Sequence, residues 1–361
     1  MGIPLFDTVT PLAGLRRRLG EAIDDVLERG QFILGPEVGS FEQELAAYLG
    51  IDHAVGVANG TEALTIALRA LDVGPGDDVV VPSFSFYASA EAIPPTGARP
   101  VFCDVDRETF CVTADTVKAA LTPRAKAVIA VDLFGNVAPV REIEALGLPV
   151  VEDAAQAIGA TGPDARAGAL GTIATLSFYP SKNLGAFGDG GAVTTADAGL
   201  AERVRTLRFH GSRDKVTYEQ VGYNSRLDEL QAAILRVQLP ELERWAAHRR
   251  DVGEWYAQAG LGELVALPRV APGTRPAWHV YVVRHERADE LGAALSAAGI
   301  GSRAYYRTPI HRQPAMAHLD GAALPATDEL ARTHLALPVS AVMTRDQVYE
   351  VVAAVRDADL G

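Results

Sequence analysis

The chain has 361 residues, of which 48% are hydrophobic and 22% charged, and its formal net charge is −13. This length suits one large domain plus a smaller one, and the acidic balance excludes broad nucleic-acid binding, which needs a basic surface. With Cys103 and Cys111 as the only cysteines, neither a disulfide framework nor a metal site is expected. No signal peptide or membrane-spanning run is recognised, so we expect a soluble, cytoplasmic protein.

Helices and strands alternate along the first half of the chain. Two helices are predicted first, over 12–29 and 37–50. Strands are then predicted over 53–58, 77–82, 99–105, 125–134, 148–155 and 173–180, with helices starting at 60, 87 and 113. The strands are continuous apolar runs, which is typical of a mainly parallel sheet buried on both faces. We therefore predict an α/β fold with a three-layer large domain and ligands at the carboxyl ends of the strands.

The pattern changes near Leu227. A long helical stretch over 226–258 is interrupted at Pro240, which breaks or kinks a helix. A strand over 278–284, a helix over 287–299 and a last helix after Met343 follow. We expect two domains, a large one at 1–245 that includes the N-terminal helical segment and a small α/β domain at 246–361.

Lys182 is the first candidate functional residue. It follows the strand at 173–180 and precedes a group of glycines in "SKNLGAFGDGGAV". A lysine in a partly apolar pocket has a lowered pKa and becomes a nucleophilic amine that can form a Schiff base. The alternative is an ordinary solvated loop lysine. The glycine spacing fits neither a Walker loop nor a dinucleotide fingerprint.

Three further features lie at strand ends or helix starts. Asp153 ends a buried strand and is either a functional carboxylate or a helix cap. Gly60-Thr61 begins a helix and is either a phosphate-binding site or only a helix cap. Phe84 and Phe86 follow another strand, as a platform for a planar ring or as core residues. Pyridoxal phosphate needs a Schiff-base lysine, an acid at its ring nitrogen, hydrogen-bond donors at its phosphate and a stacking ring. Lys182, Asp153, Gly60-Thr61 and Phe86 are the respective candidates for these roles.

The chain resembles the DegT/DnrJ/EryC1/StrS sugar aminotransferases, a branch of the fold-type-I pyridoxal-phosphate enzymes. The resemblance rests on segments in family order, among them "GQFILGPEVGSFEQELAAYLG", "GVANGTEALTIALRAL", "VEDAAQAIGA", "SFYPSKNLGAFGDGGAV", "GYNSRLDELQAAIL", "AWHVYVVR" and "IHRQPAM". It implies an aspartate aminotransferase-like fold and pyridoxal 5′-phosphate as cofactor. It also implies that Lys182 forms the Schiff base and moves a proton, and that Asp153 pairs with the pyridinium nitrogen.

The resemblance further implies the remaining site residues. The expected cofactor contacts are Gln156 near the 3-hydroxyl, Gly60, Thr61 and Ser177 at the phosphate, Phe86 on the ring, and Asn224 reaching the neighbouring subunit's phosphate. The functional unit would be a homodimer with shared active sites. Arg226 is a second cross-subunit candidate, with a salt bridge to Asp228 or Glu229 as the alternative. Tyr306, Arg307 and His311 are the sugar-side candidates, or else part of a solvated loop.

The implied reaction moves an amino group from L-glutamate to a nucleotide-diphosphate keto-sugar. A dTDP-3-keto-6-deoxyhexose is favoured on overall likeness, with a 4-keto-sugar of surface polysaccharide synthesis (UDP, GDP or dTDP) as the alternative. Departures at Asp132, Asn136, Ile158 and Arg307 bear on the substrate more than on the chemistry. A non-catalytic regulatory protein that binds the cofactor is a rival of another class, and the presence of Lys182 argues against the family's dehydratases. An amino-acid aminotransferase would instead need an arginine clamp for the α-carboxylate.

Overall fold

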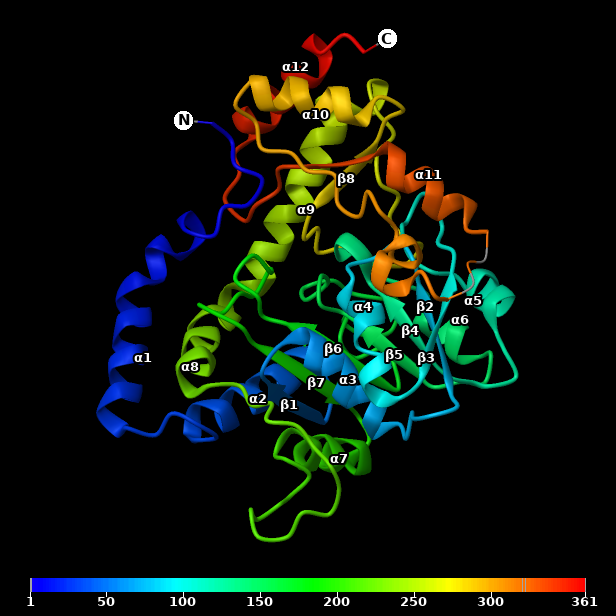
Figure 1. Ribbon diagram of the computed structural model, residues 1–361. Helices are drawn as coiled ribbons and strands as arrows, with labels where there is room; N and C mark the ends of the chain where they lie inside the picture. The colour runs from blue at the N-terminus through cyan, green and yellow to red at the C-terminus, as the bar shows by residue number, and fades with distance from the viewer. Residues whose placement is uncertain (1, 320, 322, 361) are drawn as a thin grey trace.

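The largest element of the fold is a seven-stranded sheet with the order β1-β7-β6-β5-β4-β2-β3. The structure is a computed structural model that describes residues 2–319, 321 and 323–360 (Figure 1). The strands are β1 (His53–Val57), β2 (Asp78–Pro82), β3 (Arg99–Cys103), β4 (Ala125–Val131), β5 (Val150–Asp153), β6 (Ile173–Ser177) and β7 (Gly191–Thr195). Neighbours from β3 to β6 run parallel, whereas β7 is antiparallel to both β6 and β1. The predicted mainly parallel α/β sheet is confirmed, and β7 is a strand that the sequence pattern did not identify.

Helices cover the sheet so completely that every residue of β2, β5 and β7 is buried, whichever face its side chain points to. The helices of this part of the chain are α1 (Arg16–Arg29), α2 (Pro36–Leu49), α3 (Gly60–Ala70), α4 (Ala88–Glu91), α5 (Ala114–Ala120), α6 (Val140–Glu144), α7 (Ala198–Arg208) and α8 (Glu229–Gln238). α3 packs against β6 and β7, and α8 packs against α1 and α2.

Pro240 interrupts the long helical stretch, as predicted. α8 ends at Gln238, a 3-10 turn spans Leu239–Glu241, and α9 (Leu242–Gln258) then leads away from the sheet (Figure 1). Beyond it lie β8 (Tyr281–Arg284), α10 (Ala288–Ala297), α11 (Pro325–Thr333), β9 (His334–Leu337) and α12 (Arg345–Asp357). β8 and β9 form an antiparallel pair, and a second hydrophobic cluster joins α9, β8, α10, β9 and α12. The predicted division between residues 245 and 246 falls inside α9 and stays a prediction.

The carboxyl ends of the central strands meet at one edge of the sheet. Asp153 ends β5 and Ser177 ends β6, and the next strand along, β4, is followed at once by Asp132. The backbone N–H of Asp132 donates to the carbonyl of Asp153 at 3.0 Å, which holds these ends together. Within the described residues, both cysteines are free buried thiols, and no helix is long and apolar enough to cross a membrane.

Candidate active site

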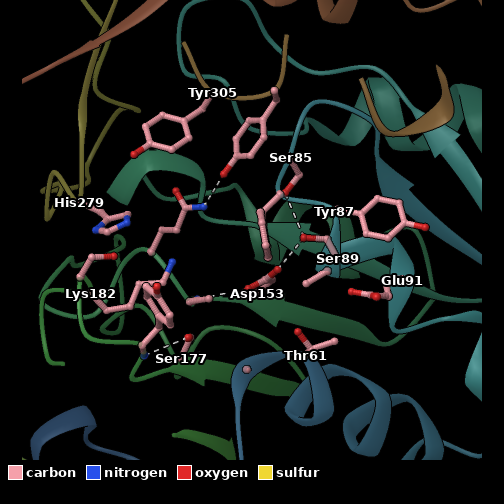
Figure 2. Close-up of a pocket in the computed structure, with 18 of the residues that line it drawn as sticks. Thr61, Ser85, Tyr87, Ser89, Glu91, Asp153, Ser177, Lys182, His279 and Tyr305 are labelled. Atoms are coloured by element: carbon pink, nitrogen blue, oxygen red, sulfur yellow. Dashed lines mark hydrogen bonds between the residues drawn. The ribbon is translucent and has the colours of Figure 1, made fainter. Parts of the chain in front are cut away.

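A cavity of about 1220 Å³ opens at this edge of the sheet (Figure 2). It brings together most of the predicted site residues, namely Gly60, Thr61, Phe86, Asp153, Gln156, Ser177, Lys182, Tyr306 and Arg307. They come from α3, the ends of β5 and β6, the loops after β2 and β6, and the segment before α11, so distant parts of the chain build one site.

Lys182 lies in the loop that joins the antiparallel strands β6 and β7. The loop turns sharply, since its backbone N–H at Lys182 donates to the carbonyl of Tyr179 at 2.8 Å. A Cβ on Gly185 would lie only 2.6 Å from the carbonyl oxygen of Pro180, so glycine is required there. Burial lowers the pKa of Lys182 from its usual 10.5 to about 8, and the Asp153 carboxylate opposes that shift. The amine is therefore partly neutral, and nucleophilic, near neutral pH.

Asp153 is buried and faces the same cavity (Figure 2). The hydroxyl of Ser89 donates to Asp153 Oδ2 at 2.8 Å, and Ser85 lies 3.0 Å from Ser89. Burial raises the pKa of Asp153, although the Ser89 hydrogen bond, the Ala155 N–H and the Lys182 charge all favour the carboxylate. Burial outweighs these three contacts, so the carboxylate would be stabilised further by a cationic partner such as a protonated pyridine nitrogen.

The start of α3 forms a cradle for an anion. The side chain of Asn59 caps the helix by accepting the Glu62 N–H at 2.8 Å. The N–H groups of Gly60 and Thr61 lie in the first turn, where an α-helix offers no internal acceptor. Gly60 approaches Ser177 so closely that an added Cβ would lie 2.7 Å from Ser177 Cβ. Backbone N–H groups and hydroxyls thus gather as a phosphate requires.

Aromatic rings line the opposite part of the cavity. Phe86 lines the cavity and leaves 57% of its surface exposed, so its ring is free to contact a bound ligand. Tyr306 stacks on Phe134 with ring centroids 6.0 Å apart. The side-chain amide of Gln156 donates to the Tyr306 hydroxyl at 3.2 Å and accepts the Phe134 N–H at 2.9 Å. Gln156 and Tyr306 are therefore held in place on the cavity wall.

Three predicted residues do not line this cavity. Asn224 forms a β-bridge with Phe209, and the Arg226 guanidinium lies 3.4 Å from the ring of His210. Glu229, one of the alternative partners for Arg226, instead accepts three backbone N–H groups at the start of α2. His311 does not line the cavity, and its Nδ1 lies 2.5 Å from the hydroxyl of buried Ser83.

Arg307 lines the cavity, but its guanidinium has other partners. It donates to the carbonyls of Ala331 and Arg332, both at 2.8 Å, and pairs with Asp289. Its contacts therefore tie this loop to the end of α11.

Sequence reasoning missed His279, Arg303 and Tyr305, which also line the cavity. Burial, followed by the charges of Lys182 and Arg249, lowers the pKa of His279 well below its usual range, so the imidazole is neutral. His279 was hidden inside an apolar strand pattern. The Arg303 guanidinium lies over the Tyr305 ring, 5.4 Å from its centroid, and only the order Arg-Ala-Tyr-Tyr hinted at this pair.

Known proteins resemble this chain along almost its whole length. Residues 15–356 match the DegT/DnrJ/EryC1/StrS aminotransferase family. The chain belongs to this family. The dTDP-3-amino-3,4,6-trideoxy-alpha-D-glucose transaminase of Streptomyces venezuelae is 44% identical over 98% of this chain and 96% of its own. The pleiotropic regulatory protein of Geobacillus stearothermophilus is 41% identical over 99% of this chain and 98% of its own.

A solved family structure, S. venezuelae DesV in complex with a ketimine intermediate, matches with a TM-score of 0.96. It is 44% identical and covers 100% of this chain and 99% of its own. The predicted family, the fold-type-I fold, the aminotransferase class and pyridoxal phosphate as cofactor are confirmed. The observed site fits the cofactor on its own terms, because it sets the Lys182 amine, a buried acid and an anion cradle around one cavity.

Proposed function

We propose that this enzyme transfers the amino group of L-glutamate to the keto group of a nucleotide-diphosphate sugar, with a dTDP-3-keto-6-deoxyhexose as preferred acceptor. The observation that carries the aminotransfer is the single cavity that Lys182 and Asp153 share, where burial also lowers the pKa of the lysine to about 8. The choice of amino-group acceptor rests on similarity to the S. venezuelae transaminase, which is named for a dTDP-linked 3-amino sugar.

The cofactor would be held by the residues already described. Gly60, Thr61 and Ser177 would bind the phosphate, and Asp153 would pair with the ring nitrogen. Gln156 would contact the 3-hydroxyl, and Phe86 would stack on the ring face. When bound, pyridoxal phosphate supplies an electron sink for the bond pair released as an α-proton leaves. Asp153 would keep the ring nitrogen protonated, since a facing cation would stabilise its buried carboxylate.

Lys182 has two tasks in this proposal. Its neutral amine holds the cofactor before the donor arrives, because only the unprotonated form is a nucleophile. Once released, the same amine takes a proton from the donor carbon and later gives one to the sugar carbon. A pKa near 8 serves both directions at neutral pH, because the amine is neither fully protonated nor fully neutral.

The sugar nucleotide would enter from the side of Tyr306 and Arg307, with His311 behind that wall. Arg307 is committed to α11, so we assign it a positioning role and give the exposed Arg303 the place nearest to a diphosphate. Arginine suits a diphosphate because its planar guanidinium donates two parallel hydrogen bonds.

We propose a cytoplasmic homodimer in which Asn224, and with it Arg226, reaches the partner's cofactor. Their position outside this chain's own cavity supports a role across an interface. Several large hydrophobic side chains are exposed, which suits a subunit interface. Val216, Tyr218 and Val221 precede Asn224 in sequence, Phe32 and Ile33 contact the start of α8, and Tyr179 and Phe187 belong to the loop that carries Lys182. We also propose the division into domains 1–245 and 246–361, which the separate hydrophobic cluster beyond α9 supports.

The rival functions predict different behaviour. A 4-keto-sugar aminotransferase would keep the first half-reaction and reject 3-keto acceptors. A regulatory protein, as the name of the Geobacillus relative suggests for that protein, would bind the cofactor without turning over. The intact set of Lys182, Asp153 and Ser177 favours catalysis.

An absorbance spectrum of the purified protein loaded with pyridoxal phosphate tests the proposal. The yellow band of the lysine-bound cofactor should bleach with L-glutamate, and a keto-sugar nucleotide should restore it. Lys182→Ala should show neither the band nor the bleaching. A wild-type band that L-glutamate leaves unchanged would overturn the proposal.

A further inference from the structure

A second cavity, of about 290 Å³, adjoins the first. Phe6, Ser181 and Lys182 line both cavities, so the Lys182 side chain lies at their boundary. The rest of its wall comes from the N-terminal segment, the loop after β6, helices α8 and α9, and Ala341 between β9 and α12. Nothing in the proposed chemistry so far uses this space.

Three buried side chains on this wall carry a polar atom that has no hydrogen-bond partner among the described residues. They are Asn183 (Oδ1), Trp245 (Nε1) and Arg249 (Nε), exposed by only 7%, 4% and 7%. Native proteins rarely leave such groups unsatisfied, so each calls for an explanation. Because two of the three atoms are donors and one belongs to a cation, an acceptor with negative charge fits them better than a neutral group.

Arg249 also lacks a counter-charge. Its Nη1 donates to the carbonyls of Trp278 and Val339, both at 3.1 Å, and no ion pair with it occurs in the described part of the chain. Burial lowers its pKa to about 10. Asp7 is the only acidic residue among the described lining residues. Its carboxylate accepts the backbone N–H groups of Val9 and Thr10 and does not pair with Arg249. A buried, unpaired guanidinium is costly, which points to an anion that arrives with a ligand.

Resting on the proposed function, we propose that the second cavity binds the distal carboxylate of the amino-group donor, with Arg249 and Trp245 donating to its oxygens. The donor's α-carbon must react beside Lys182, which takes its proton. The α-carboxylate is one bond from that carbon and stays in the large cavity. The second carboxylate of L-glutamate lies three bonds further along the side chain and passes Lys182 into the second cavity. A water molecule satisfies the acceptor Asn183 Oδ1.

This assignment makes the second cavity the source of donor selectivity. A dicarboxylic amino acid neutralises the Arg249 charge on binding, whereas a neutral side chain leaves the guanidinium buried and unpaired. An amide in place of the distal carboxylate keeps the shape and loses the charge, so it should bind more weakly.

Calorimetry on the cofactor-loaded enzyme tests the proposal without turnover. The probe is glutarate, an unreactive diacid with the carbon chain of glutamate, compared with its monoamide and with butyrate. Glutarate should bind wild type at least about tenfold more tightly than either comparison compound. Arg249→Gln should weaken glutarate binding by about tenfold to a hundredfold, and Trp245→Phe, which keeps an aromatic ring, by about threefold or more. Arg250→Gln is the matched control, because Arg250 follows on α9 and lines neither cavity.

Unchanged glutarate binding in both Arg249→Gln and Trp245→Phe would overturn the proposal, as would equal binding of glutarate and butyrate by wild type. A crystal structure with glutarate should place a carboxylate between Trp245 and Arg249. Water alone there, or a side chain of a partner subunit, contradicts it. The two proposals fail separately. A wild-type band that L-glutamate does not bleach removes the proposed function. If L-glutamate bleaches the wild-type band, but Arg249→Gln weakens the reactions with L-glutamate and L-glutamine equally, only the proposed donor site is ruled out.

Discussion

The Lys182 amine should capture pyridoxal phosphate at a pH far below that required by an exposed lysine. Burial lowers its pKa from 10.5 to about 8. At pH 7.5 about a quarter of the amines are then neutral, against about one in a thousand for an ordinary lysine. The buried lysine therefore offers on the order of a hundredfold more neutral, reactive amine than an exposed one. We expect the rate of cofactor capture by the cofactor-free protein to rise with pH and to reach half its maximum near pH 8.

Asp153→Asn supplies the internal check. The Asp153 carboxylate raises the pKa of Lys182, so its removal should move the midpoint below the wild-type value. Capture is followed by absorbance after mixing, and borohydride reduction with peptide mass analysis assigns the adduct to Lys182. A wild-type midpoint above pH 10, or a midpoint that rises in Asp153→Asn, would refute the reasoning.

The same shift has a consequence for stability. Because the pKa of Lys182 is lower in the folded than in the unfolded chain, the folded protein binds fewer protons between about pH 8 and 10.5. The penalty for burying this amine is therefore full below pH 8 and fades as the pH rises toward 10.5. Lys182→Met should raise the free energy of unfolding of the cofactor-free protein at pH 7 and lose that gain above pH 10.

Other predictions concern the fold and the anion cradle. Glu229→Gln should lower the free energy of unfolding by about 2–4 kcal/mol in urea titrations, because the buried carboxylate accepts three N–H groups of α2 at 2.8–2.9 Å; a loss below about 0.5 kcal/mol would contradict this. Gly60→Ala should weaken pyridoxal phosphate binding by about tenfold or more, because its Cβ would lie 2.7 Å from Ser177 Cβ, while phosphate-free pyridoxal binds as before; equal losses for both compounds would contradict it. Burial raises the pKa of Cys103 and Cys111 far above the usual range, so iodoacetamide at pH 8 should label them only after unfolding.

Much of the large domain could be predicted because its strands are continuous apolar runs that end in polar residues. Asp153 and Lys182 stand at such ends, so strand order alone brings them to one edge of the sheet. β7 was missed because "GAVTT" is short, mixed in polarity and follows glycines. One of its two antiparallel partners, β1, also lies far away in the sequence.

The contacts of individual side chains could not be read from the sequence. Arg307 had the right chemistry for a diphosphate, yet the end of α11 supplies carbonyls that use its donors. Arg249 was one basic residue in "AAHRRD" and shows its lack of a counter-charge only when its surroundings are assembled. Such features depend on tertiary packing, for which the local pattern carries no signal.

The most direct test of the central claim follows the nitrogen atom itself. The cofactor-loaded enzyme is incubated with L-glutamate labelled with heavy nitrogen and with dTDP-3-keto-6-deoxyhexose, and the sugar nucleotide is analysed by mass spectrometry. The account predicts an amino-sugar nucleotide that carries the label, together with 2-oxoglutarate, and no product from Lys182→Ala. A product without the label, or no product from any keto-sugar nucleotide although the enzyme is fully loaded, would contradict it.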